Sequence, residues 1–250
     1  MKDAADNKAY EKLPLIYPYL MRKVNYSVWA KYIHSLVKEN TTINSTALEL
    51  GAGNCSFADK FYCFFPNLIV TDISKNMLRS GGSNLFPRVC CDMSRLPFKT
   101  KFDVIYCTFD SVNYLTSRKK LLDMFKQAAI LLRDSGILTF DASLEKNSLL
   151  YANEPERSGV YKGIKFKQKT EYNIKTKIHK NTFFIKMKSG EIFKEVHIQR
   201  IFPFETFFEL LDRAGLFVCN CYEAFSYKVG SPESERVQFI IKKIKKDVNF

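Results

Sequence analysis

The 250-residue chain has few residues that break regular structure and no apolar run long enough to enter a membrane. It contains 10 glycines and 8 prolines, which excludes collagen-like repeats and linker-rich architectures. No uninterrupted apolar run approaches the roughly 18 residues of a membrane span. The first twelve residues, MKDAADNKAYEK, lack the apolar stretch of a secretory signal. We therefore expect a cytoplasmic protein without a membrane partner.

Cysteine pairs of the metal-binding kind are also missing. The seven cysteines form no C-x-x-C motif, and Cys219 and Cys221 are too close together for the usual zinc pair. Their odd number offers no disulfide framework. We expect buried thiols in a reducing compartment and no metal site.

Positive charge is what the chain has in excess. Its 39 Lys+Arg against 26 Asp+Glu give a formal net charge of +13. Residues 162–200 alone hold eleven Lys or Arg and three acids. Such a stretch could bind nucleic acid or an acidic substrate. It could equally be the solvent-exposed face of an antiparallel sheet. Because the lysines are not interleaved with arginines and stacking aromatics, nucleic acid is not the favoured partner.

Short apolar strands alternate with helices over most of the chain. Hydrophobic residues make up 46%, which excludes a largely disordered chain. Apolar spacing predicts helices over 13–21, 26–37 and 118–132, the last ended by Ser135-Gly136, and strands over 46–50, 68–72, 87–92, 102–108 and 137–141. This alternation predicts a parallel sheet covered on both faces, with ligands beyond the carboxyl ends of its strands.

After residue 160 the pattern changes to strand–turn–strand. Residues 161–200 alternate apolar and polar side chains, with a hairpin turn at Ser189-Gly190. We expect three or four antiparallel strands here, then a helix over 203–215 and strands over 216–225 and 235–243. Residues 1–160 and 201–250 would form one α/β unit, and residues 161–200 a β insertion after its fifth strand.

Glycines and acids stand at the ends of the first three predicted strands. Glu49 is followed by Gly51-Ala52-Gly53, where glycines allow a tight turn and close approach of a ligand to the main chain. Asp72 can bind both ribose hydroxyls, and Asp92 can accept a hydrogen bond from an adenine amino group. A dinucleotide site would need a third glycine, and Glu49 would repel its pyrophosphate. The cationic methionyl half of S-adenosylmethionine suits that carboxylate.

These segments resemble the motifs of the class I S-adenosylmethionine-dependent methyltransferases. The similar segments are ALELGAGN (47–54), VTDISKNML (70–78), CCDMSRLPF (90–98), FDVIYCTFDSVNYL (102–115) and LLRDSGILTFD (131–141). The resemblance implies a Rossmann-like α/β fold with a seven-stranded, mostly parallel sheet. It also implies S-adenosylmethionine as cofactor and S-adenosylhomocysteine as its product. The implied cofactor contacts are Glu49, Gly51, Ala52, Gly53, Asp72, Ile73, Met77, Asp92, Met93 and Thr108.

The chain is more closely similar to the bacterial YqeM-like methyltransferases. The segments that carry this similarity are YSVW (26–29), DSVNYL (110–115), EVHIQR (195–200) and SERV (234–237). The resemblance implies a helical N-terminal lid and an antiparallel platform over the acceptor pocket. Tyr17 is then a cofactor contact, and Trp29 is either a second contact or a core residue. The chain departs from the family pattern at Cys55, where a further glycine is usual, and at Pro18, where an acid is usual.

Asp110 and Asn113 follow the fourth strand, beside the expected position of the methyl group. We predict that both are catalytic, with Asp110 orienting the acceptor or the cofactor amino group. The alternative is that Asp110 only caps a turn. Tyr114, in the same segment, is a predicted substrate contact.

Glu195, His197 and Gln199 share one face of a predicted strand because they are spaced by two. His197 is a candidate base near neutral pH, or else a structural residue. Glu195 and Arg200 are predicted substrate contacts, with Arg200 holding an anionic group. The other two histidines, His34 and His179, are expected at the surface.

The favoured function is methyl transfer to nitrogen or oxygen of a small molecule, because a platform encloses a pocket rather than a groove. One alternative is an RNA or protein methyltransferase that uses the basic insertion. Against it, CTFD (107–110) stands where an Asn/Asp-Pro-Pro-Tyr/Phe segment would be. A second alternative is a non-catalytic regulator that binds S-adenosylmethionine. The sequence indicates no oligomeric state.

Overall fold

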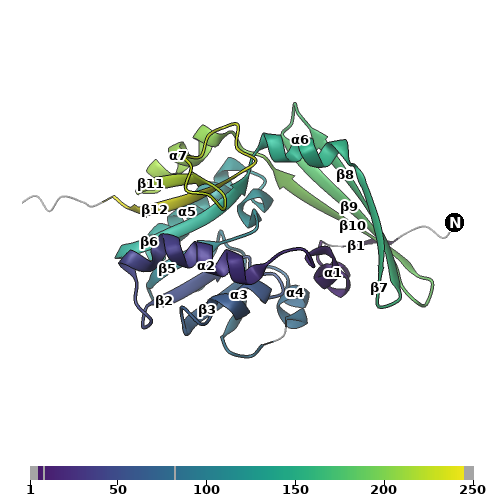
Figure 1. Ribbon diagram of the computed structural model, residues 1–250, viewed down its shortest axis with the longest axis horizontal. Coiled ribbons are helices and arrows are strands. Elements are labelled where there is room, and N and C mark those ends of the chain that lie inside the picture. Colours follow the sequence, from purple (N-terminus) through teal and green to yellow (C-terminus); the bar gives the residue numbers. More distant parts are fainter. Residues whose placement is uncertain (1–4, 8, 82, 245–250) are drawn as a thin grey trace, which may run out of the picture.

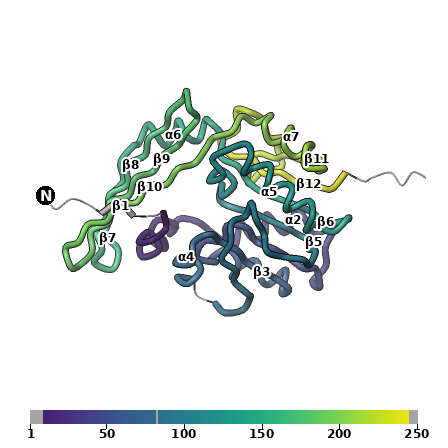
Figure 2. Tube along the Cα trace, turned by 180° about the vertical axis from the view of Figure 1, so that it is seen from behind, coloured from purple at the N-terminus to yellow at the C-terminus, as the bar shows by residue number. Residues whose placement is uncertain are grey.

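The computed structural model describes residues 5–7, 9–81 and 83–244 of the chain. Two β-sheets lie next to each other, and helices pack against both (Figure 1). Helix α1 (Tyr17–Leu20) and the carboxyl ends of the parallel strands lie between the two sheets (Figures 1 and 2).

The larger sheet has seven strands in the order β11-β12-β6-β5-β2-β3-β4. They are β2 (Thr46–Leu50), β3 (Asn67–Asp72), β4 (Arg88–Cys90), β5 (Phe102–Cys107), β6 (Leu132–Ser143), β11 (Leu216–Glu223) and β12 (Arg236–Lys243). Only β12 runs against its neighbours. The strand order reverses between β2 and β5, and sheets of this kind bind ligands at that point. The predicted α/β class and seven-stranded, mostly parallel sheet are confirmed.

Helices cover both faces of this sheet with apolar stripes. One face carries α5 (Arg118–Leu131) and α7 (Phe204–Asp212), and the other carries α2 (Tyr26–Val37) and α3 (Ser56–Phe61). Apolar residues of α5 recur at steps of three and four, which places them on one side of the helix. Phe125 of α5 packs 5.4 Å from Phe140 of β6, between ring centroids, and Phe61 of α3 packs 4.7 Å from Tyr106 of β5. No helix in the described ranges has the length and apolar character needed to cross a bilayer.

Two local predictions differ from the structure. Helix α5 ends at Leu131 and β6 begins at the next residue, so the predicted helix stop at Ser135-Gly136 is wrong. Gly136 lies inside the strand, where a Cβ atom would come within 2.9 Å of the Leu132 side chain. Helix α6 (Glu145–Asn153) was not predicted, because Ser148 is its one buried residue and it has no apolar stripe. A short helix, α4 (Lys75–Ser80), connects β3 to β4.

The second sheet has five strands in the order β1-β10-β9-β8-β7. They are β1 (Ala5–Asn7), β7 (Glu156–Tyr161), β8 (Ile164–Asn173), β9 (Ile178–Lys186) and β10 (Ile192–Arg200). The sheet begins at Glu156 rather than at residue 161, and β1 adds a parallel strand from the N-terminal segment that no motif predicted. Gly190 has a φ of +91° in the turn between β9 and β10, which confirms the predicted hairpin.

The N-terminal segment covers one face of the five-stranded sheet. A 3₁₀ turn, η1 (Leu13–Leu15), and helix α1 (Tyr17–Leu20) replace the single helix predicted over 13–21. Leu13 and Ile16 are buried against Phe166 and Ile185 of the sheet. No described helix or strand covers the opposite face (Figures 1 and 2).

Candidate functional site

The turn after β2 requires its glycines for both backbone conformation and space. Gly51 and Gly53 have φ values of +69° and +55°, in the left-handed region that side chains disfavour. A Cβ atom on Gly51 would lie 3.3 Å from Cε of Met93. A Cβ atom on Gly53 would lie 3.2 Å from Cε of Met77 and 3.9 Å from Oη of Tyr17. The structure therefore brings these three predicted contact residues to the glycine turn.

Asp72 ties the glycine turn to the start of α4. Its Oδ2 accepts a hydrogen bond from the Gly53 N–H at 2.8 Å, and its Oδ1 accepts one from the Ser74 N–H at 2.7 Å. Burial raises the pKa of the Asp72 carboxyl, and the two main-chain hydrogen bonds lower it again. Each carboxylate oxygen has a second lone pair. The side chain can therefore hold a diol without giving up these bonds.

The adenine-side residues lie at the ends of β3 and β4. Asp92 is half-buried, and its Oδ1 accepts hydrogen bonds from the N–H and the hydroxyl of Ser94, both at 2.8 Å. Ile73 is 67% exposed and Met77 is buried. An exposed Ile73 offers an apolar surface for an aromatic base, so the predicted contacts have room for adenine on this side.

Glu49 is a buried acid at the end of β2. Its Oε2 accepts a hydrogen bond from the Tyr106 hydroxyl at 3.2 Å. Burial raises the pKa of Glu49 to about 8, the Tyr106 bond lowers it, and the nearby Asp72 and Asp59 raise it further. Among the described residues, no Lys, Arg or His forms an ion pair with this carboxyl. A cationic ligand at the glycine turn would supply the missing charge, and the methionyl half of S-adenosylmethionine fits that requirement.

Substituting Glu49 with glutamine is expected to change how stability depends on pH. The folded-state pKa of Glu49 lies above the ordinary value of 4.5, so its stabilising contribution is complete at low pH and is lost as pH rises through about 8. The wild-type free energy of unfolding should therefore fall relative to that of Glu49→Gln between pH 5 and pH 9. Urea denaturation at several pH values measures this difference. A constant difference across the series would contradict the raised pKa.

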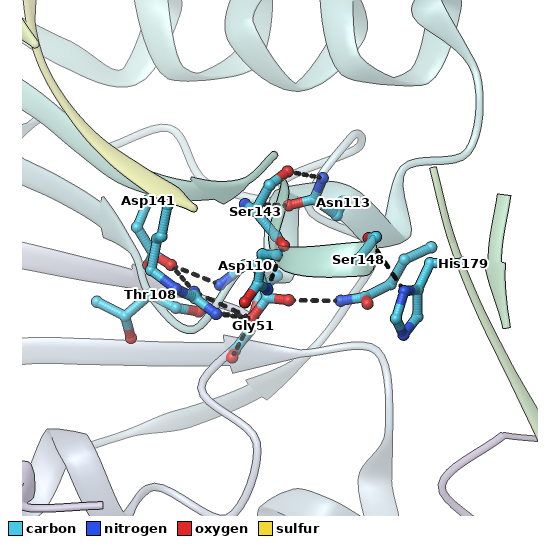
Figure 3. A network of polar contacts seen from close by, with 12 residues as sticks. Gly51, Thr108, Asp110, Asn113, Asp141, Ser143, Ser148 and His179 are labelled. Atoms are coloured by element: carbon cyan, nitrogen blue, oxygen red, sulfur yellow. Dashed lines mark hydrogen bonds and ion pairs between the residues drawn. The ribbon is translucent and has the colours of Figure 1, made fainter. Parts of the chain in front are cut away.

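Asp110 is held by side chains from three other strands (Figure 3). Its N–H donates to Oδ2 of Asp141 at 2.8 Å, and its Oδ1 accepts from Nη1 and Nη2 of Arg236, each at 3.1 Å. Its Oδ2 accepts from Nε2 of Gln199 at 2.9 Å. Phe109 and Asp110 have φ values of +58° and +49°. Non-glycine residues rarely adopt this conformation, and strain of this kind is concentrated at functional sites.

Asp141 is the fully buried member of this network, and the half-buried Arg236 pairs with it. Arg236 Nη1 hydrogen-bonds to Oδ2 of Asp141, which has no exposed surface. Burial would lower the pKa of Arg236, but Asp110 and Asp141 raise it above its ordinary value. The guanidinium therefore stays charged between two carboxylates, and it links the end of β5 to β6 and β12.

Asn113 holds a positioning role in this structure, and its predicted catalytic role stays a prediction. It lies in a 3₁₀ turn, η3 (Ser111–Tyr114), and has no exposed surface. Its Nδ2 donates to the main-chain oxygens of Ser143 at 3.2 Å and Arg200 at 3.0 Å, and its Oδ1 accepts from the Ser143 N–H at 3.0 Å. Both of its N–H groups are used (Figure 3). It therefore has none to offer a substrate, and it fixes η3 to both sheets.

Glu195 and His197 are buried on the face of β10 that lies toward the parallel strands. Nε2 of His197 lies 3.4 Å from Oε2 of Glu195, while Oε1 of Glu195 accepts the N–H groups of Lys12 and Leu13. In the described part of the chain, neither ring nitrogen of His197 nor Oε2 of Glu195 has a hydrogen-bond partner. Buried polar atoms without partners are costly and usually point to a water or a ligand.

Aromatic rings surround the His197 imidazole. Its centroid lies 4.5 Å from the ring of Tyr10, 5.3 Å from Phe183 and 6.4 Å from Tyr114, all in edge geometry. Burial raises the pKa values of Tyr10 and Tyr114, so both phenols stay neutral at physiological pH. Tyr114 and Glu195 thus lie near His197, as their predicted shared role requires.

Two predicted positions, Trp29 and Arg200, lie elsewhere. Trp29 packs 4.4 Å from the ring of Phe109 and 4.1 Å from that of Phe225, so its cofactor contact stays a prediction. The Arg200 guanidinium lies 5.8 Å from the centroid of the Phe202 ring, and its anion contact stays a prediction.

The remaining positions are Thr108 and two histidines. Thr108 is buried, and its carbonyl accepts the Ser111 hydroxyl at 2.8 Å. His179 is buried and its Nδ1 lies 3.0 Å from the Ser148 hydroxyl, so its predicted surface position is wrong. His34 is half-buried and stacks on Phe64.

Four residues of the site were not predicted from the sequence. Asp141 lies two residues before the end of β6, and it ends the strand predicted over 137–141 as Asp72 ends the strand predicted over 68–72. Its position therefore carried a usable signal. Arg236 belonged to a segment singled out only for its family resemblance. The sequence around Tyr10 and Ser111 contains no pattern that predicts their contacts. In the structure, Tyr10 lies against His197 and Ser111 lies against Gly51.

Comparison with known proteins agrees with this geometry. Residues 48–140 match the family model described as a methyltransferase domain. YqeM of Bacillus subtilis (strain 168), named as a candidate methyltransferase, is 26% identical over 250 residues, which are 94% of this chain and 98% of that protein.

Two solved structures share the fold. An S-adenosylmethionine-dependent methyltransferase from Clostridium acetobutylicum ATCC 824 has a TM-score of 0.78 at 23% identity, over 94% of this chain and 98% of that one. The sugar N-methyltransferase KedS8 from Streptoalloteichus sp ATCC 53650 has a TM-score of 0.72 at 16% identity, over 97% and 96%.

Proposed function

We propose that this chain, a class I S-adenosylmethionine-dependent methyltransferase of the YqeM type, methylates nitrogen or oxygen of a small-molecule acceptor. The observation that carries the proposal is the pair Glu195 and His197. Both are buried, both have polar atoms without partners among the described residues, and they share a strand face with Gln199, which contacts Asp110. An enclosed polar site of this kind fits a small molecule better than a polymer.

The cofactor supplies a methyl group already activated by a positive sulfonium, so the protein's main tasks are alignment and exclusion of water. We assign Asp72 to the ribose hydroxyls and Asp92 to the adenine amino group. Glu49 offsets the positive charge, and Asp110 orients the methionyl end beyond β5. Because Arg236 and Gln199 already hold the Asp110 carboxylate, its orientation is set before the ligand arrives.

On the acceptor side, His197 takes the proton that the attacking atom must lose. With the cofactor bound, a ring nitrogen of His197 would accept the proton that the acceptor atom loses on methylation. Glu195, 3.4 Å away, stabilises the resulting imidazolium. Tyr114 lines the same space. An amine is a natural acceptor for this set of groups, and the sugar N-methyltransferase with the same fold makes amino sugars a reasonable first panel.

A label-transfer screen tests the proposal. The protein is incubated with methyl-labelled S-adenosylmethionine and, separately, with panels of amines and hydroxylated metabolites, bulk tRNA, and protein extract. We expect label in the low-mass fraction. Label in tRNA or protein would favour the alternative that the acceptor is a polymer. Cofactor binding with no transfer in any fraction would favour a non-catalytic regulator.

Replacing His197 by asparagine should lower kcat toward the acceptor found in that screen by about 10²-fold or more, which is the usual contribution of a positioned base. The dissociation constant for S-adenosylmethionine should stay within about twofold, because His197 does not belong to the cofactor side. His34→Asn is the matched control, since that histidine stacks on Phe64 away from the site. Thermal unfolding of both variants separates loss of the base from loss of the fold. An unchanged kcat in folded His197→Asn would remove the base assignment.

A further inference from the structure

The face of the five-stranded sheet opposite the N-terminal segment is a solvent-exposed surface with an aromatic residue near its centre. Phe184 of β9 is 37% exposed there. Cross-strand register places Lys167 of β8 and Lys194 of β10 directly opposite Phe184, on either side. Lys186 lies two residues along β9, on the same face. No described helix or strand lies over this side of the sheet in either view (Figures 1 and 2).

Further lysines complete a surface that we call the lysine platform. Its members are Lys165, Lys167, Lys169, Lys180, Lys186 and Lys194, which surround Phe184 on the outward face of β8, β9 and β10. Neighbouring strands are ~4.8 Å apart and same-face residues ~6.7 Å apart along a strand. The lysines are therefore regularly spaced on one face of the sheet, with the exposed Phe184 ring among them.

Acidic residues neutralise only part of the platform. Glu156 pairs with Lys167 at 2.9 Å, and Glu171 pairs with Lys169 at 3.1 Å and Lys180 at 2.7 Å. These pairs are exposed, and such pairs contribute little, so an incoming anion can displace them.

Lys165 and Lys186 lie directly opposite each other on adjacent strands, and neither pairs with an acid in the described part of the chain. Like charges in directly opposed positions destabilise a sheet. An anionic partner at this position would remove that repulsion.

We propose that the lysine platform binds single-stranded nucleic acid, with phosphates on the lysines and a base stacked on Phe184. Surfaces that bind single strands combine positive charge along the backbone with aromatic rings that accept any base. The sheet brings both features to one face, because it places Phe184 among lysines of three strands, a proximity that the order of residues in the sequence does not show. That face is opposite the one that carries Glu195 and His197, so the nucleic acid docks away from the acceptor site and is not the acceptor. The proposal therefore does not depend on the proposed function.

Charge and shape favour this partner over an anionic membrane. Besides Phe184, the apolar side chains on this face include Ile198 and Val160, which lie in the sheet rather than on a protruding loop. A peripheral membrane site needs an apolar surface that can enter the lipid. A strand of nucleotides needs only regularly spaced cations and a ring.

Fluorescence anisotropy with labelled 20-mers of uridylate and of deoxythymidylate, on the full chain over 50–200 mM salt, tests the proposal. We expect binding that weakens steeply with salt, with a slope of about 0.7 per phosphate contact on a log–log plot. Lys165→Glu combined with Lys186→Glu should weaken binding at least about tenfold and reduce that slope by about 1.4. Phe184→Ala should weaken binding by about tenfold with little change in slope, because stacking carries no counterion release.

The control variant combines Lys120→Glu and Lys126→Glu on α5, which changes the net charge equally on exposed residues elsewhere. It should lose less than threefold in affinity. Equal losses in both double variants, or binding without a salt slope, would overturn the proposal. A third outcome would also overturn it: the 20-mers do not bind, while vesicles of phosphatidylserine and phosphatidylcholine bind the wild type but not the Lys165/Lys186 variant. The platform would then be a membrane site. Unchanged urea midpoints and unchanged S-adenosylmethionine affinity show that the variants keep their fold and cofactor site.

Discussion

Replacing Arg236 by methionine is expected to lower the free energy of unfolding by about 3–5 kcal/mol. Arg236 donates two hydrogen bonds to Asp110 and another to Asp141. Burial raises the pKa of Asp141, and Arg236 lowers it again. Without the guanidinium, two carboxylates face each other with no cation between them. Removing one charge from a buried ionic network lowers the free energy of unfolding by more than the intact network raises it, because the remaining charge is left buried without a partner.

Urea denaturation measures this loss, and Arg213→Met is the matched control. Arg213 forms an exposed pair with Glu209 at 3.5 Å, so its replacement should change stability by less than ~1 kcal/mol. Combining Arg236→Met with Asp141→Asn should recover part of the loss, because the double variant removes one unpaired charge. If Arg236→Met unfolds at the wild-type midpoint, then the charges around Asp110 are not coupled as the geometry indicates.

Replacing Asp72 by alanine should weaken S-adenosylmethionine binding by at least ~2 kcal/mol, or about 30-fold. A carboxylate that accepts two ribose hydroxyls makes charge-assisted hydrogen bonds, which are stronger than neutral ones. The variant also loses the bonds from Asp72 to Gly53 and Ser74, at 2.8 Å and 2.7 Å, which hold the glycine turn against the start of α4.

Isothermal titration with S-adenosylmethionine and S-adenosylhomocysteine measures the effect, and Ser74→Ala separates its two sources. The Ser74 hydroxyl accepts the Met77 N–H at 3.2 Å and caps α4. Its loss disturbs the helix start, at a cost of about 1 kcal/mol in stability, without removing a charge. We expect Ser74→Ala to bind the cofactor within about fivefold of the wild type. Equal affinities for Asp72→Ala and the wild type would remove the ribose assignment.

The cofactor side was predictable because its signals are local. A strand buried on both faces is a continuous apolar run, so the polar residue that ends it marks the sheet edge. Gly51, Gly53, Asp72 and Asp92 could be read in this way, and the parallel topology then brings consecutive strand ends to one edge. The distance from the Gly53 N–H to Asp72, 2.8 Å across 19 residues, follows from that topology. The left-handed φ values at the two glycines, together with the side chains that a Cβ atom would meet there, favour glycine at both positions.

The acceptor side depended on how two sheets pack, which no local pattern contains. Asp110 meets Asp141, Gln199 and Arg236 across 31, 89 and 126 residues. The alternation of residues along the strand places Gln199 and His197 on one face. It does not predict which other element of the fold packs against that face. The same limit led to the wrong position for His179, which is buried. Short-range spacing thus identified the strand-end residues of this methyltransferase. Burial of apolar surface is non-directional, so only the three-dimensional path of the chain decided which polar groups were enclosed together.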